Sequence, residues 1–223
     1  MTADTPARVL PLAVRRYGQH FTPEERADTV FPWLPGGPDL WGENCCGLAC
    51  LRMVLDHFSM DVPPQRRLLA QGLELGAYTP KGWHHQGLVH LAAAYGLTGA
   101  AIPCDSPLPL PLPLPLPLPL QRLALAGIPS ITSCTFRFPE DGRKGGHLVL
   151  FRGETIREGE RRAAFADPSR WGAQHDEVRA ERFWASWTGR AVVLWPADGP
   201  GIDLPEVFHI SNLPRGDVRW EPT

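Results

Sequence analysis

A cysteine that opens a helical pattern is the residue of this chain best suited to chemistry. Cys46 stands directly before Gly47, and apolar residues recur at helical spacing from Leu48 to Phe58. The backbone N–H groups and the dipole at the start of a helix favour the thiolate, which is the nucleophilic form of cysteine. The segment therefore predicts a thiol nucleophile at a helix N-terminus.

Two residues later in the chain complete a set for nucleophilic catalysis. His147 begins an apolar strand pattern, and Asp167 ends the strand pattern that follows it. We expect the two strands to be antiparallel neighbours joined by a charged hairpin, so that the carboxylate meets the imidazole. Asp167 would then orient His147, which takes the proton of the Cys46 thiol and later protonates the leaving group.

Three segments in this order resemble the papain-like cysteine peptidases of the bacteriocin-leader-processing type. The segments are 46–55, 146–150 and 166–168, and the resemblance extends over most of residues 10–197. It implies a papain-like fold and hydrolysis of a peptide or related amide bond through a Cys46 thioester. It also implies a peptide or protein substrate, and neither a metal ion nor an organic cofactor.

The same resemblance implies an oxyanion hole, built from the Cys46 backbone N–H and a glutamine side chain. The usual glutamine position, six residues before Cys46, holds Leu40. Gln19 and Asn44 are the two candidates for the missing donor. We also expect Asn44, Trp41 and Gly146 to contact the substrate.

Three alternatives remain open at this stage. The chain is a catalytically weak or inactive peptide-binding protein if neither candidate supplies the oxyanion donor, because each donor lowers the barrier by about 2.7–4 kcal/mol. The same triad also suits an acyltransferase, which passes the acyl group to an amine instead of water. A zinc site that uses Cys46, Cys50 and nearby histidines is disfavoured, because no second close ligand pair completes it.

The elements that must position these residues predict an α+β fold, with a helical half followed by an antiparallel sheet half and the active site between them. Residues 32–42 read as an extended loop that leads to the thiol. We expect helices at 46–58, 64–73, 83–95, 120–127 and 180–187, and strands at 12–17, 128–136, 147–152, 163–166 and 191–195.

Length and composition favour one domain over residues 1–223. A Leu/Pro alternation at 107–120 predicts a polyproline II insertion that acts as a stiff spacer, and 198–223 reads as a C-terminal extension. The net charge of −2 disfavours a nucleic-acid partner. No secretory signal or membrane-spanning run is found, and the odd number of cysteines suggests reduced thiols, so we expect a cytoplasmic protein without membrane partners. The oligomeric state cannot be predicted.

Overall fold

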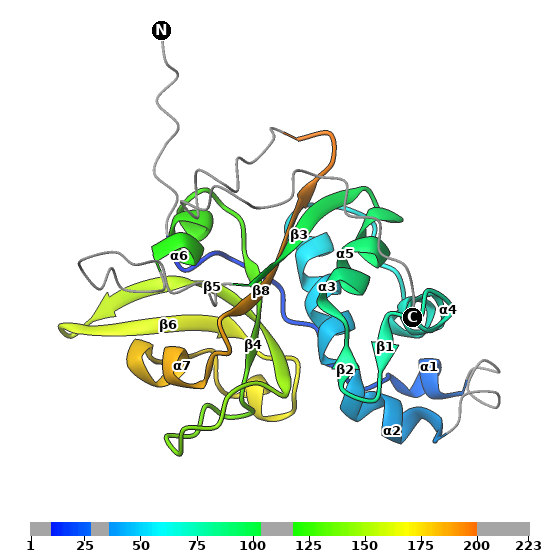
Figure 1. Cartoon of the computed structure of the whole chain (residues 1–223), viewed down its shortest axis with the longest axis horizontal. Helices are drawn as coiled ribbons and strands as arrows, with labels where there is room; N and C mark the ends of the chain where they lie inside the picture. Colours follow the sequence, from blue (N-terminus) through cyan, green and yellow to red (C-terminus); the bar gives the residue numbers. More distant parts are fainter. Residues whose placement is uncertain (1–9, 28–35, 104–117, 200–223) are drawn as a thin grey trace, which may run out of the picture.

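The computed structural model describes residues 10–27, 36–103 and 118–199. Within these ranges a helical half and an antiparallel sheet half lie side by side, which confirms the α+β prediction (Figure 1). The helices are α1 Pro23–Arg26, α2 Gly37–Asn44, α3 Cys46–His57, α4 Gln65–Glu74, α5 His85–Ala93, α6 Leu118–Leu125 and α7 Ala180–Ser186. Residues 104–117 and 200–223, which include most of the Leu/Pro alternation and of the C-terminal extension, lie outside the described residues.

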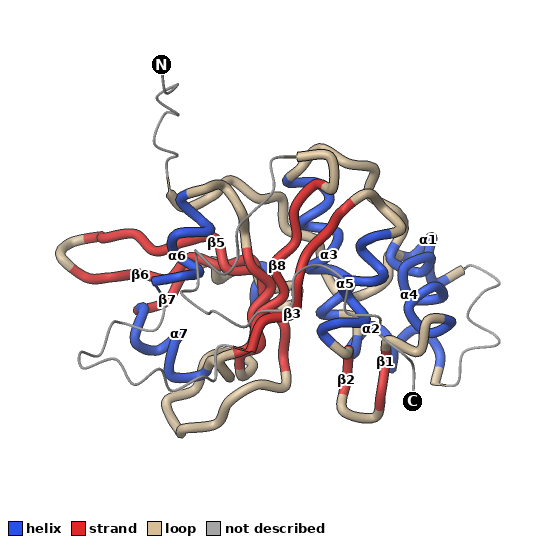
Figure 2. Tube along the Cα trace, turned by 45° about the horizontal axis from the view of Figure 1, so that its top comes forward, coloured by secondary structure: helices blue, strands red, loops and turns tan. Residues whose placement is uncertain are grey.

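The main sheet has six strands in the order β3-β8-β4-β5-β6-β7, and its paired strands are antiparallel. These strands are β3 Leu97–Pro103, β4 Ser130–Cys134, β5 His147–Arg157, β6 Glu160–Ala166, β7 Glu177–Arg179 and β8 Arg190–Pro196. A separate hairpin of β1 Tyr78–Thr79 and β2 Gly82–Trp83 lies beside the helices (Figure 2). β5 and β6 pair as expected, so His147 and Asp167 reach the same end of the sheet.

Both faces of the main sheet are covered by apolar packing. Along β5, Leu148 and Leu150 belong to the core shared with the helical half, whereas Val149 and Phe151 belong to a second core shared with α6 and α7. Successive side chains of a strand point to opposite faces, so this alternation places one core on each side. The sheet half is therefore rigidly supported where it meets the helical half.

The region before the nucleophile differs from the prediction. Residues 37–42 of the predicted extended loop belong to α2, which continues to Asn44. Gly36 adopts a left-handed conformation with φ of 89° at the N-cap, and Pro38 lies in the first turn, where its missing N–H costs no intrahelical hydrogen bond. The Pro/Gly content that predicted a loop therefore starts a helix.

Other element boundaries were also wrong in part. Residues 12–17 form no strand, although the Leu12 N–H donates to the Arg152 carbonyl (2.9 Å). The last residues of the Leu/Pro alternation, from Leu118 onwards, belong to α6 rather than to polyproline II, because Leu120 is buried against the sheet. The helix expected from residue 83 begins at His85, after β2. Strand β3 was missed.

Candidate active site

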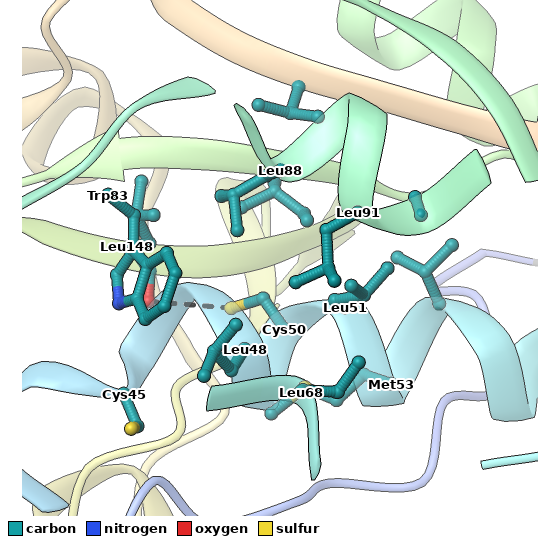
Figure 3. Close-up of a cluster of buried hydrophobic side chains, with 14 of the residues drawn as sticks. Cys45, Leu48, Cys50, Leu51, Met53, Leu68, Trp83, Leu88, Leu91 and Leu148 are labelled. Atoms are coloured by element: carbon teal, nitrogen blue, oxygen red, sulfur yellow. Dashed lines mark hydrogen bonds between the residues drawn. The ribbon is translucent and has the colours of Figure 1, made fainter. Parts of the chain in front are cut away.

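Helix α3 begins at Cys46, as predicted, and its first turn is pressed against β5. A Cβ atom on Gly47 would lie 3.0 Å from Leu148 Cδ1 and 3.1 Å from Leu88 Cδ1, so glycine permits this close approach. One turn further on, the Cys50 thiol donates to the Leu148 carbonyl (3.5 Å), which Figure 3 draws as a dashed line. These contacts fix the start of α3 beside the residue that follows His147.

Among the neighbouring thiols, Cys46 is the accessible one. Cys45 and Cys50 are fully buried, whereas Cys46 is partly exposed. Burial raises the pKa of the Cys45 and Cys50 thiols well above the ordinary range, so both remain protonated and unreactive at neutral pH. This environment separates Cys46 from the two cysteines that the sequence places next to it.

The imidazole of His147 lies between a carboxylate and the Cys46 thiol. His147 Nε2 lies 2.8 Å from Asp167 Oδ1, and the Cys46 thiol is close enough to the ring to raise the pKa of His147. His147 is 8% exposed and Asp167 is fully buried, so little water screens the pair. The ring of Phe136 packs edge-on against the imidazole, with 5.5 Å between centroids. The geometry therefore brings together the three residues of the predicted triad.

Electrostatics favour a charged histidine at this position. Burial alone would lower the pKa of His147, but its interactions with Asp167 and Cys46 outweigh burial and raise this pKa to about 10. Burial likewise opposes ionisation of Asp167, yet the hydrogen bond and charge of His147 hold the Asp167 pKa below its usual value. At neutral pH the site thus favours an imidazolium beside a carboxylate.

Asp167 is fixed by contacts that sequence reasoning missed. The Ser169 amide donates to Asp167 Oδ1 (2.7 Å), and Arg16 Nε donates to the Asp167 carbonyl (2.6 Å). A Cβ on Gly172 would lie 2.2 Å from that same carbonyl oxygen, so this position accepts only glycine without movement of Asp167. Arg16 is 151 residues away in sequence and carries no motif, so only the fold reveals its role.

Of the two candidates for the oxyanion donor, Gln19 has the more suitable position. Gln19 is buried, its backbone N–H donates to the Pro168 carbonyl (2.8 Å), and its side-chain Nε2 donates to the Glu43 carbonyl (3.1 Å). It therefore lies between the residue after Asp167 and the end of α2. The Asn44 side chain instead donates to the Leu40 carbonyl within α2 (2.8 Å).

The other predicted substrate contacts differ in accessibility. Trp41 is only 8% exposed and packs edge-on against Tyr78, with 5.0 Å between ring centroids, so most of its indole surface is already covered. Gly146 is exposed, has a φ of 88°, and has open space where a Cβ would stand. Gly146 is thus the more accessible of the two.

The described residues contain neither a metal-ligand cluster nor a membrane-spanning helix. No group of three or more His, Cys, Asp or Glu side chains there is arranged to hold a metal ion. None of the described helices combines the length and apolar character that crossing a bilayer requires.

Known proteins were compared at the levels of sequence and structure. No protein-family model matches the chain, and no curated protein matches it. Similar solved structures include the peptidase domain of Streptococcus ComA, a bi-functional ABC transporter involved in a quorum sensing pathway. Its TM-score is 0.48 and its identity 22%, over 69% of this chain and 92% of that chain.

Two further solved structures are similar. One is a double glycine motif protease from an AMS/PCAT transporter in complex with the leader peptide, with a TM-score of 0.47, 20% identity, and coverage of 83% of this chain and 94% of that chain. The other is the peptidase domain of Streptococcus mutans ComA, with a TM-score of 0.38, 20% identity, and coverage of 68% and 91%. These neighbours are peptidase domains of the kind that the sequence motifs resemble, whereas the chemistry of this chain depends on its own side chains.

Proposed function

We propose that the protein is a cysteine peptidase that cleaves a peptide or related amide bond through a Cys46 thioester. One observation carries the proposal: a buried His147 ring is hydrogen-bonded to Asp167, and the accessible Cys46 thiol at the start of α3 interacts electrostatically with the same ring. An imidazolium next to a thiol at a helix N-terminus is an arrangement that favours the nucleophilic thiolate.

The proposed reaction has two halves. Cys46 Sγ attacks the carbonyl carbon, and the resulting oxyanion is held by the N–H groups that begin α3, together with Gln19 Nε2. Cys45, the N-cap of α3, makes no side-chain cap hydrogen bond, so its side chain does not occupy those N–H groups. His147 gives its proton to the leaving amine, which departs and leaves the acyl group on sulfur.

Water then completes the cycle. His147, now neutral, accepts a proton from a water molecule, whose oxygen attacks the thioester carbonyl. Collapse of the second tetrahedral intermediate releases the carboxylic acid and returns the Cys46 thiolate beside the imidazolium. Asp167 remains ionised throughout and keeps the imidazole oriented.

A peptide carrying an electrophilic carbonyl group tests the assignment. We expect rapid labelling of wild type at Cys46, loss of labelling in Cys46→Ala, and slow labelling in His147→Ala. Peptide mass spectrometry locates the label, and the buried Cys45, Cys50 and Cys134 serve as internal controls. Equal labelling of wild type and Cys46→Ala would sink the proposal. The mass of a cleaved product, with or without an added amine, distinguishes hydrolysis from acyl transfer.

A further inference from the structure

Both lysines of this chain lie at the same cavity. Lys81 and Lys144 are the only lysines among its 22 basic residues. They stand 63 positions apart in the sequence, yet both line one open cavity of about 650 Å³. Because lysine is so rare in this protein, the shared location distinguishes this cavity from the rest of the surface.

The cavity lies next to the proposed active site. Gly146, which precedes His147, lines it on the sheet side, and Trp83 lines it on the helical side. Trp83 Nε1 donates to the Asn44 carbonyl (2.6 Å), two residues before Cys46. The cavity thus borders the segment that carries the base and is linked to the segment that carries the nucleophile through Trp83, so a substrate that extends from the scissile bond could reach it.

Its charge is positive on both sides. Arg190 lines the cavity together with the two lysines, and the described lining contains no Asp or Glu. His85 also lines it, but burial and the charge of Arg190 lower the pKa of His85, so this histidine adds no positive charge at neutral pH. Among the described residues, no carboxylate forms an ion pair with Lys81 or Lys144. The whole chain has a net charge of −2, so this cationic character is local.

Ordered turns hold both lysines in place. Lys81 lies in the turn between β1 and β2, where its amide donates to Thr79 Oγ1 (3.2 Å). Lys144 precedes Gly145, whose amide donates to the Ser186 carbonyl (3.3 Å). A Cβ on Gly145 would lie 2.6 Å from Thr188 Cγ2, so the loop is packed closely onto the sheet half. The fold therefore fixes the backbone of both lysines at the cavity.

We propose that this cavity is a substrate subsite that binds acidic side chains of the peptide, close to the bond that is cleaved. The inference rests on the proposed function, because it assigns the occupant of a cavity beside the Cys46–His147 pair. Lysine presents a compact charge without the planar fork of arginine, so it suits carboxylates in several orientations. The expected substrate is a peptide with Asp or Glu within a few residues of the scissile bond.

Binding to the Cys46→Ala variant tests the subsite without any need for catalysis. The probes are matched short peptides that carry Glu, Gln or Lys at the same positions and a neutral dye. Each exposed ion pair contributes up to about fivefold in affinity. Replacing both lysines by Gln should therefore weaken binding of the Glu peptide about tenfold at low salt and leave binding of the Gln peptide unchanged. Replacing both lysines by Arg instead should preserve binding of the Glu peptide.

Arg143→Gln is the matched control. Arg143 is in the same loop as Lys144 but pairs with Asp141 (2.7 Å) and does not line the cavity, so its loss should not affect binding. Equal affinity for the Glu and Gln peptides, or an equal loss in Arg143→Gln, would overturn the subsite. Electrophile labelling of Cys46 is measured separately, so failure of the subsite and failure of the peptidase assignment give different results.

Amine-selective modification of the folded protein provides a second test without substitutions. Reductive methylation keeps the charge of both lysines, whereas acetylation removes it, and the α-amino group reacts in both treatments. Only acetylation should weaken binding of the Glu peptide. If methylated and acetylated protein bind this peptide equally well, the lysine charges do not form the subsite.

Discussion

Replacement of Asp167 by Asn probes the charge balance of the site most directly. The substitution is nearly isosteric, and the new side-chain oxygen can still accept the hydrogen bond that the Ser169 amide gives Asp167 Oδ1 at 2.7 Å. It removes the negative charge that faces His147 Nε2 at 2.8 Å. We therefore expect the fold to persist while the imidazolium loses its buried partner.

The structure sets the size of the expected effect. The His147 pKa rises from 6.5 to about 10, which corresponds to a preference of about 5 kcal/mol for imidazolium, shared between Asp167 and Cys46. Burial acts in the opposite direction, so loss of the Asp167 hydrogen bond and charge should lower the His147 pKa. The alkylation of Cys46 near pH 6 should then slow by at least about tenfold, because the imidazolium no longer stabilises the thiolate.

Two measurements check this prediction. NMR titration of the His147 ring reports its pKa, and alkylation with iodoacetamide across pH, read by peptide mass spectrometry, reports Cys46 reactivity. Asp176→Asn is the matched control, because the side chain of Asp176 is 78% exposed and pairs only with Arg152 at 3.4 Å. An unchanged His147 pKa and unchanged alkylation in Asp167→Asn would refute the electrostatic account of the site.

Two further predictions concern packing and pH. Gly47→Ala should destabilise the fold by about 1–3 kcal/mol and slow labelling of Cys46, because the new Cβ would lie 3.0 Å from Leu148 Cδ1. Thermal melting measures the stability, and the electrophilic peptide measures the labelling rate. Unchanged values of both would contradict the close approach of α3 to β5. The stability that His147 gains from its raised pKa is fully present below pH 6.5 and is lost as pH rises towards about 10, whereas the contribution of Asp167, whose pKa is lowered, is lost in acid. The difference in unfolding free energy between wild type and His147→Gln should therefore be largest near pH 5–6, and urea titrations that show no such maximum would contradict the assignment.

The sequence was most informative where a regular apolar repeat lay next to a residue with catalytic chemistry. Helix α3 was predicted at nearly its observed bounds because its apolar residues repeat at helical spacing and are buried. The β5–β6 pair was predicted from two apolar strands around a charged turn, and this pairing brought His147 to Asp167. Local patterns were sufficient here because the two strands are consecutive in the chain.

Sequence reasoning failed where a residue's role depends on a distant partner. Gly99 weakens the strand pattern of β3, yet its Cβ would lie 2.1 Å from the Val193 carbonyl, so the close approach of β8 requires glycine there. Arg16, which holds the Asp167 carbonyl, gave no signal for the same reason. In each case the constraint comes from a residue at least 94 positions away, which no local pattern can report.

Residues 16–19, which begin within the run predicted as a strand at 12–17 and extend beyond it, connect the two halves of the site. Arg16 donates to the carbonyls of Asp167 and Ser169 in the sheet half, and the Gln19 N–H donates to Pro168. From the same segment, Gln19 Nε2 donates to the Glu43 carbonyl just before the α2–α3 junction. Residues 16–19 therefore contact both halves, through the side chains of Arg16 and Gln19 and through the Gln19 backbone N–H. A shift of this segment would move the carboxylate and the start of α3 relative to each other, so the alignment of Cys46 with His147 depends on a segment that contains neither residue.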